Sequence, residues 1–461
     1  MKLKKKNIYQ YLFLLILTVM TLFNGGLKNL FIQYNFIIIS IFFLQFIKDK
    51  NYYAHVKKIL RDNKIAIYLY FIFIGFLIFQ TIPIPLEWLN FLSPEKYNYL
   101  VKMEYIGNFN SITLSPVNSY FNILNYLSLF LFLVIFKSLF YKKRDIVKFY
   151  FFLVLLGAFA SSVAIYFYLI GNPDFLILKN YPSKESATGF FYNRTVFSCF
   201  LSLCFFGGIE YLKIIDYYQK NNQDNYFNKI YIRIFIIFIT IGIITSFSRL
   251  GNFLFISLII IYILHALLTS EKKNSFFLIT LILIVLFDVL ILGFYFGSER
   301  LLQRFLFLQT ELIEYLPTQN IEDDNSTLLS KNTSISRGDL SSFALIGFRE
   351  NFIFGYGAGS FEHLFKVKFQ YLEGNVPSNQ YAVHAHSDLI EFFGEFGLIG
   401  TILIISSAVF FYNKKYFFTL KNFLLFYLLL FILLFDFSFH YPLIQFIFII
   451  LLSINYKKNN I

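Results

Sequence analysis

The chain has 461 residues and a formal net charge of +13, and 57% of its residues are hydrophobic, 22% aromatic and only 15% charged. Average soluble domains carry about 25% charged residues, so this composition argues against a soluble globular protein, and its hydrophobicity excludes an intrinsically disordered chain. With 2 Cys and 22 Gly, the chain is neither a disulfide scaffold nor collagen-like.

Long apolar segments recur along the chain. A membrane-spanning helix needs about 20 apolar residues, and these segments lack the alternating pattern of a membrane β-barrel. We therefore expect an all-α polytopic integral membrane protein with about twelve transmembrane helices. In chain order, the predicted spans are residues 8–24, 29–47, 65–83, 120–140, 149–170, 195–213, 233–248, 251–269, 276–296, 397–412, 422–437 and 441–455.

Basic residues gather in alternate loops between these spans. The positive-inside rule places such loops in the cytoplasm, so we expect both termini to be cytoplasmic. The basic segments on this side are Lys2 to Lys6, Lys48 to Lys64, Lys142 to Lys148, Lys213 to Arg233, Lys272 and Lys273, Lys414 to Lys421, and Lys457 and Lys458.

This topology divides the chain into three parts. Residues 1–296 are expected to hold nine transmembrane helices with short outer loops, 297–396 a large outer loop, and 397–461 the last three helices. The large loop contains 13 acidic and 7 basic residues. The basic balance of the chain therefore follows its topology, and no nucleic-acid partner is expected. Within the loop, helices are predicted at 344–354 and 378–396.

Arginine is placed differently from lysine. Most of the 31 Lys lie inside in this topology, whereas six of the 9 Arg lie outside. The planar guanidinium suits a phosphate or carboxylate, which favours an anionic ligand at the outer face; salt bridges with the acidic residues of the loop are the alternative. Arg249 lies between two apolar segments, so it needs a partner, either a ligand phosphate or a carboxylate such as Asp288. The outer arginines are Arg194, Arg249, Arg300, Arg304, Arg337 and Arg349.

The densest group of ionisable residues lies between His384 and Thr401. On a helix, Asp388, Glu391 and Glu395 would share one face. His384 and His386, two residues apart, would point away from each other on a helix and could not bind one metal ion, so no metal site is expected. An outer histidine among acids and arginines is a candidate general base, because its usual pKa is near 6.5.

His386-Ser387, nine further residues and then Gly397-Leu398-Ile399-Gly400-Thr401 resemble the signature of the O-antigen ligase and O-antigen polymerase superfamily. The resemblance covers most of the chain, from about residue 80 to 405. Further segments similar to this family are 83–94, 111–116, Ser248 to Gly251, and Arg337 to Phe354 followed by Gly355 to Phe361.

The resemblance implies a GT-C-like, inverting, metal-independent membrane glycosyltransferase without a cofactor. Such an enzyme takes a glycan from undecaprenyl diphosphate at the periplasmic face of the bacterial inner membrane. A ligase passes the glycan to lipid A–core, and a polymerase passes it to a second lipid-linked glycan. The implied partners are thus the lipid-linked oligosaccharide donor, one of these acceptors and membrane lipids. A transporter for a lipid-linked sugar is a less favoured alternative, because the chain shows no clear internal repeat.

The resemblance also implies roles for individual residues. His386 matches the catalytic histidine, which deprotonates the acceptor hydroxyl. Arg249 and Arg337 match the arginines that hold the diphosphate, and Arg194 is expected to join them. The residues expected to support this site are Asp288, Ser387 and Glu391.

Overall fold

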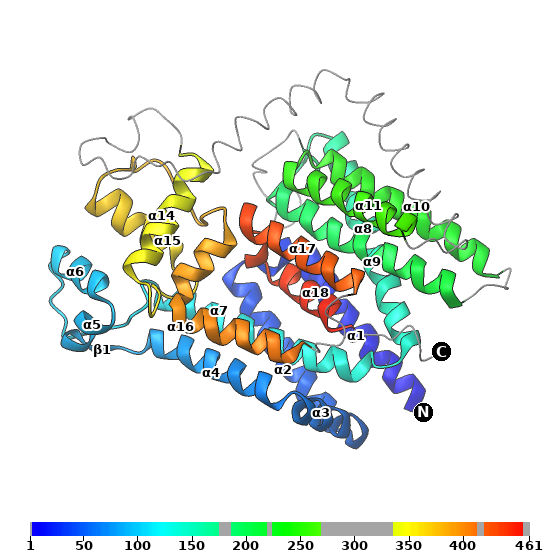
Figure 1. Ribbon diagram of the computed structural model, residues 1–461, viewed down its shortest axis with the longest axis horizontal. Coiled ribbons are helices and arrows are strands. Elements are labelled where there is room, and N and C mark those ends of the chain that lie inside the picture. Colours follow the sequence, from blue (N-terminus) through cyan, green and yellow to red (C-terminus); the bar gives the residue numbers. More distant parts are fainter. Residues whose placement is uncertain (1, 175–185, 219–223, 269–334, 413–418, 455–461) are drawn as a thin grey trace.

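The computed structural model describes residues 2–174, 186–218, 224–268, 335–412 and 419–454. Most of these residues are helical, and the helices form an elongated bundle (Figure 1). The long helices of the first half are α1 (Lys2–Leu22), α2 (Asn29–Ile47), α3 (Lys50–Asp62), α4 (Lys64–Thr81), α7 (Pro116–Leu139), α8 (Lys143–Leu169), α9 (Arg194–Tyr218), α10 (Asp224–Thr245) and α11 (Arg249–Leu268).

The second half contributes one interrupted helix and several shorter elements. Its helical segments are α14 (Arg337–Glu350), α15 (Phe361–Leu364), η2 (Phe365–Leu372), α16 (Asp388–Phe411), α17 (Leu420–Phe435), η4 (Ser438–His440) and α18 (Pro442–Ser453). The remaining elements are η1 (Asn24–Gly26), α5 (Leu86–Leu92), α6 (Pro94–Lys102) and a small hairpin of β1 (Ile84–Pro85) and β2 (Phe109–Asn110).

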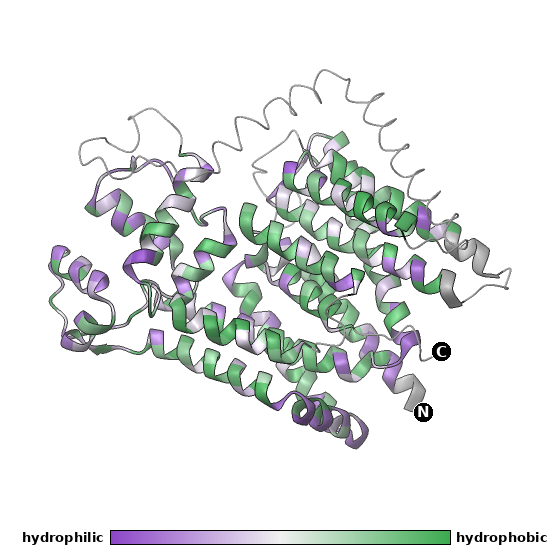
Figure 2. Cartoon of the chain, in the orientation of Figure 1, coloured by the Kyte–Doolittle hydropathy of each residue, from purple (hydrophilic) through white to green (hydrophobic). Residues whose placement is uncertain are grey.

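The membrane character of the bundle agrees with the prediction. Within the described residues, α2, α4, α7, α8, α9, α11 and α16 contain stretches long and apolar enough to cross a membrane, and the apolar parts of α1, α10, α17 and α18 are shorter. Figure 2 shows the apolar residues concentrated along these helices. Eleven of the twelve predicted spans thus coincide with an apolar helix or part of one, and the span predicted at 276–296 lies outside the described residues.

Helix α9 lies at the centre of the bundle. Its apolar stretch is completely buried, and α8, α10, α11 and α18 pack against it. Small residues permit this close packing, because a Cβ added at Gly157 of α8 would lie 2.6 Å from Cys204 of α9. Cys199 and Cys204 are buried and free, as their spacing on one helix predicts.

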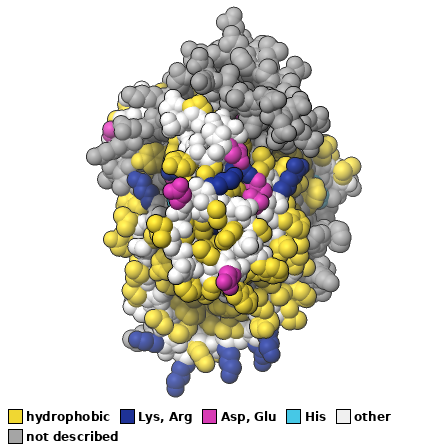
Figure 3. Space-filling model, turned by 90° about the vertical axis from the view of Figure 1, so that its left-hand side faces the viewer, with side chains coloured by type: hydrophobic (Ala, Val, Ile, Leu, Met, Phe, Trp, Pro, Cys, Tyr) yellow, Lys and Arg dark blue, Asp and Glu magenta, His cyan; other side chains and the backbone are white. Residues whose placement is uncertain are grey.

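The two ends of the bundle differ in composition. At the lysine end, defined by α3 and the start of α8 at Lys143, charged helix turns follow the apolar segments (Figure 2). At the opposite end, called here the histidine end, α14, α15 and η2 pack around a separate small apolar core that includes Phe343, Phe361 and Phe369. Figure 3, which views α5, α6 and α14 from outside, shows acidic and basic side chains next to one another on this end.

One expected loop and the bounds of two expected helices were wrong. The basic segment Lys48 to Lys64, expected as a loop, contains the helix α3. Asp49 caps this helix by accepting a hydrogen bond from Asn51 N (3.1 Å), and the helix buries Tyr52 and Val56, four residues apart.

The helix predicted at 344–354 begins earlier and ends earlier, as α14. A capping box fixes its start, because Ser336 Oγ accepts from Asp339 N (3.1 Å) while the Asp339 carboxylate accepts from Ser336 N (2.9 Å). The helix predicted at 378–396 begins only at Asp388. Residues 378–387 are irregular, and His386 has φ +56°, a left-handed conformation incompatible with an α-helix.

Candidate active site

A glycine breaks α16 and brings a loop against it. Gly397 has φ +63° and ψ −173°, so the backbone hydrogen bonds of α16 are interrupted there. Hydrogen bonds with residues 352–357 take their place. Leu398 N donates to Phe352 O (2.8 Å), and Tyr356 N donates to Gly394 O (2.9 Å). The backbones lie so close that a Cβ at Gly397 would be 2.4 Å from Gly355 N.

The loop of residues 352–361, which contains Gly355, Gly357 and Gly359, also contacts the early segment 111–116. Leu114 N donates to Tyr356 O (2.9 Å), and Thr113 Oγ1 lies 3.0 Å from Ser360 Oγ. The ammonium of Lys96 donates to Ser111 O (2.6 Å) and Thr113 O (2.5 Å) beneath this contact, and burial lowers the pKa of Lys96 to about 7. Segments 111–116, 355–361 and 397–401, which carry the family resemblance, are thus packed together.

The histidine loop, residues 384–387, is held on two sides. Ser341 Oγ of α14 donates to Ala385 O (3.1 Å), and Ala385 N donates to Glu391 Oε2 of α16 (2.7 Å). Ser387, which precedes α16 and is buried, donates to Leu433 O of α17 (3.5 Å). These contacts fix the backbone on either side of His386.

The surroundings of His386 favour its neutral form. Burial, followed by the positive charge of Arg337 and then by His384, lowers the pKa of His386 to about 3, against the opposing effect of Glu391. Nδ1 of His386 is shielded from solvent and has no hydrogen-bond partner within the part of the chain that the structure describes. The ring is therefore uncharged at neutral pH and can accept a proton.

A turn between the last two long helices lies against both histidines of the loop. The ring of Phe437 stacks on His384 at 4.9 Å and meets His386 edge-on at 4.8 Å between centroids. Asp388 N of α16 donates to Asp436 O (3.1 Å), which fixes this turn to the start of α16. Burial raises the pKa of Asp436 to about 6, although a hydrogen bond from Ser438 and the charge of Arg337 oppose the rise.

Arg337 therefore lies close enough to act electrostatically on both His386 and Asp436. These residues come from α14, the histidine loop and the turn after α17, three segments that are far apart in sequence. The structure thus brings together His386 and Arg337, both expected from the sequence, and adds Asp436, which sequence reasoning did not identify.

His440 joins the two carboxylates at the start of α16. Its Nδ1 pairs with Asp388 Oδ1, and its Nε2 lies 3.3 Å from Glu391 Oε1, which is also 3.0 Å from His384 Nδ1. Phe439 N donates to the other oxygen of Asp388 (2.7 Å). The side chains of Asp388, Glu391 and His440 are at most 6% exposed, so each charge depends on these partners. The sequence feature that could have indicated this role is the position of His440, a histidine in the short gap between two apolar segments.

The same cluster has the spacing of a metal site. The nearest donor atoms of His384, Glu391 and His440 lie within 4.8 Å of one another, and the Asp388–His440 pair resembles the outer carboxylate that orients a metal-binding histidine. The helical argument does not apply here, because His384 and His386 precede α16, and the candidate ligands are His384, Glu391 and His440. The expectation that no metal binds stays a prediction. The arrangement can hold either a shared proton or a divalent cation.

Arg194 and Arg249 each begin a helix, and these helix starts are in contact. Asn193 caps α9 by accepting from Thr195 N (2.7 Å). A Cβ added to Gly251 of α11 would lie 2.1 Å from Ser198 Oγ of α9, so the first turns of α9 and α11 pack directly together. Both arginines therefore lie at one end of the bundle.

This end is the histidine end. Phe253, one turn after the start of α11, contacts Phe431 near the end of α17 (5.0 Å between centroids), and α17 leads directly into Asp436. Arg249, four residues before Phe253, is thus near the level at which α17 ends. Asp288, Arg300 and Arg304 lie outside the described residues.

Comparison with known proteins identifies the segment that carries these residues. Residues 234–405 match the family model described as O-Antigen ligase. This range includes Arg249, Arg337 and His386 and ends before the turn that carries Asp436 and His440. No curated protein and no solved structure matches the chain. Residues 234–405 are thus similar to the O-antigen ligase family, and they lie in a largely helical chain with several helices long and apolar enough to cross a membrane.

Proposed function

We propose that the protein is an inverting glycosyltransferase of the ligase type. It transfers a glycan from undecaprenyl diphosphate to an acceptor hydroxyl such as one of lipid A–core. The observation that supports this proposal is a buried, neutral imidazole, His386, within electrostatic range of the guanidinium of Arg337. A base for the acceptor and a cation for the leaving group are the two requirements of such a transfer.

In the proposed reaction, the acceptor oxygen attacks the anomeric carbon on the face opposite the diphosphate. The bond from this carbon to the diphosphate oxygen breaks, and its electrons leave with the diphosphate. The acceptor proton passes to the imidazole of His386. Arg337, Arg249 and Arg194 stabilise the charge that develops on the phosphate oxygens, and each charge-assisted hydrogen bond contributes about 1.5–3 kcal/mol.

Donor binding would activate the base. The charge of Arg337 is one reason for the low pKa of His386. A diphosphate bound to Arg337 would offset this charge and place negative charge near the ring, which raises the pKa of the imidazole. His386 then becomes a stronger base only in the complex, so a proton is not taken from water in the free enzyme.

The proposed location of the reaction is the periplasmic face of the bacterial inner membrane. The lysine end carries the basic segments that the positive-inside rule assigns to the cytoplasm, and the proposed site lies at the opposite end. We further propose that no metal takes part and that the cluster of His384, Glu391 and His440 holds a proton, which His440 shares with the carboxylates of Asp388 and Glu391.

The test is complementation of a deletion strain with the wild-type gene and with His386→Ala. The variant should insert in the membrane but leave lipid A–core without polymer while carrier-linked polymer accumulates. His363→Ala, on α15 at the same end of the bundle, is the matched control and should behave like the wild type. Full transfer by a well-expressed His386→Ala variant would disprove the proposed role of His386. A core bearing a single repeat in the deletion strain would instead identify a polymerase.

A further inference from the structure

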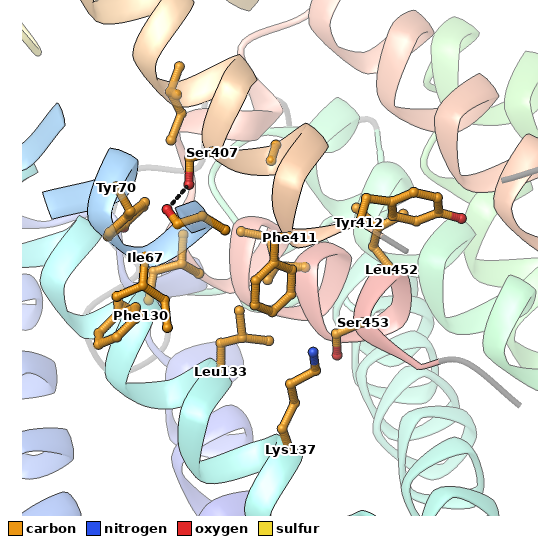
Figure 4. Close-up of a pocket in the computed structure, with 15 residues that line it drawn as sticks. Ile67, Tyr70, Phe130, Leu133, Lys137, Ser407, Phe411, Tyr412, Leu452 and Ser453 are labelled. Carbon is orange, nitrogen blue, oxygen red and sulfur yellow. Dashed lines mark hydrogen bonds between the residues drawn. The ribbon is translucent and has the colours of Figure 1, made fainter. Parts of the chain in front are cut away.

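A small apolar cavity lies between α4, α7, α16 and α18 at the lysine end of the bundle. Its volume is about 130 Å³, it is only partly enclosed, and most of its lining side chains are hydrophobic. Figure 4 shows Ile67, Leu133, Phe411 and Leu452 facing the space from four different helices. The cavity is at the opposite end of α16 from His386, so it does not belong to the proposed catalytic site.

Four side chains of the lining carry hydroxyl groups, and that of Tyr412, which is hydrogen-bonded with Asn422, points away from the space (Figure 4). The other three are already engaged within the protein. Those of Tyr70, Ser407 and Ser453 each donate to a backbone carbonyl, at 2.7, 2.9 and 2.8 Å. They therefore have no hydrogen left to donate to a ligand. Any polar recognition in this cavity must come from another group.

That group is the ammonium of Lys137. Its Nζ lies 4.0 Å from the centroid of the Phe411 ring and has no ion pair or hydrogen bond with any residue that the structure describes. None of the residues that line the cavity is acidic. An ammonium has three donors, and a charge at the edge of a membrane requires a counter-charge, so the lining is complementary to an anion.

The position of the cavity indicates what this anion is attached to. Lys137 lies two residues before the end of α7, and Lys142 and Lys143 follow it, so the ammonium is close to the expected level of the lipid head groups. The apolar part of the cavity extends from Lys137 along the helices, toward Leu129 and Ile404. A ligand with a phosphate at one end and a hydrocarbon chain at the other fits both features.

We infer that this cavity is a binding site for an anionic phospholipid of the leaflet at the lysine end. The phosphate contacts Lys137 and part of an acyl chain fills the space beside Phe411. A phospholipid is chosen over a polyprenyl carrier because the arginines proposed to hold the carrier diphosphate are at the histidine end. The inference does not depend on the proposed enzymatic activity.

The test is native mass spectrometry of the full-length protein titrated separately with phosphatidylglycerol and phosphatidylcholine. The wild type should retain phosphatidylglycerol preferentially. Lys137→Met should weaken this binding by about tenfold, since one charge-assisted contact is lost, and Lys137→Arg should restore most of it. Lys64→Met, an exposed lysine at the same end and outside the cavity, is the matched control and should bind like the wild type.

A second variant tests the apolar part. Ala408→Phe fills the cavity without changing charge and should reduce phosphatidylglycerol retention as well; size-exclusion chromatography checks that each variant is folded. Equal binding of both lipids, equal loss in the Lys64 and Lys137 variants, or unchanged binding by Ala408→Phe would each overturn the inference. Preferential retention of undecaprenyl phosphate over phosphatidylglycerol would overturn the choice of ligand.

Discussion

The two ends of the bundle neutralise their buried carboxylates in different ways. At the lysine end, Asp145 pairs with Lys6 (2.6 Å) and Glu210 with Lys213 (3.0 Å). At the histidine end, Glu391 pairs with His384, and the imidazole of His440 also faces it. An ammonium group and an imidazole differ in their usual pKa, and only that of the imidazole lies near physiological pH. The two buried carboxylates at the lysine end are therefore matched by ammonium groups, whereas Glu391 at the histidine end is matched by imidazoles.

The comparison separates charged pairs that hold helix ends in place from groups that can take up a proton. A fixed ion pair holds a helix end in place, but it cannot take up a proton from a substrate. The histidine end holds His386, the proton acceptor that we propose, near other ionisable groups and within electrostatic range of Arg337.

The largest effect is expected for His440→Ala. It leaves Asp388 and Glu391 buried without one of their partners, and breaking such a pair destabilises a protein by about 3–5 kcal/mol. Thermal unfolding in detergent should show this loss, together with a loss of transfer activity. Lys6→Met breaks an ion pair at the lysine end, so its activity per folded molecule should remain that of the wild type. Equal activity losses in both variants would contradict the difference between the ends.

His440 also allows the proton and metal alternatives to be separated. If a proton occupies the cluster, a chelator should change neither the unfolding temperature nor the transfer rate, and His440→Gln should recover part of the stability lost in His440→Ala. Inhibition by the chelator that added divalent metal reverses would assign the cluster to a cation instead.

Gly397→Ala should have the next largest effect. An alanine there would be strained at φ +63° and would clash with the backbone of residues 353–355, so we expect a loss of about 2–5 kcal/mol. Gly75→Ala is the control, because a Cβ at this position in α4 meets no atom within 4 Å. That variant should be at least as stable as the wild type, since alanine favours a helix. Equal unfolding temperatures for the two variants would show that the break tolerates a side chain.

A smaller effect, confined to activity, is expected for Arg337→Lys. The variant keeps the charge but loses the planar pair of donors, so transfer should slow by about 10- to 100-fold, the equivalent of one charge-assisted hydrogen bond. Arg349→Lys, on the exposed side of the same helix α14, should leave the rate unchanged. Initial rates of glycan transfer with purified donor and acceptor measure both. A full rate for Arg337→Lys would rule out a bidentate diphosphate contact.

The smallest effect concerns Asp436 and pH. Its pKa in the folded protein, about 6, lies above the usual value of 3.8. The folded state therefore binds the proton more tightly than the unfolded state, and the resulting stability is complete below pH 3.8 and is lost as the pH rises through 6. Between pH 5.5 and 7.5 this group should remove about 1 kcal/mol. Unfolding curves of Asp436→Asn should lack this component, and an unchanged pH dependence would contradict the raised pKa.

The membrane helices were predictable because a 20-residue apolar segment is a local property of the sequence. His386 and Arg337 were singled out through the resemblance of their segments to a known family, and their roles in catalysis stay predictions. His440 and Asp436 were missed because their roles arise from contacts across about 50 residues, which depend on how α17 and the following turn pack against α16. The helix expected at 378–396 failed for a local reason, since the backbone of His386 cannot continue a helix.

The interruption of α16 at Gly397 has a mechanical consequence. The backbone hydrogen bonds of α16 are interrupted between residues 388–396 and 398–411, and the irregular segment 352–357 is hydrogen-bonded to both parts. A displacement of residues 398–411 is therefore transmitted to residues 388–396 through the segment that follows α14. Because α14 also holds the histidine loop through Ser341, the positions of His386 and of the part of α16 that bears Glu391 both depend on α14 and the segment that follows it.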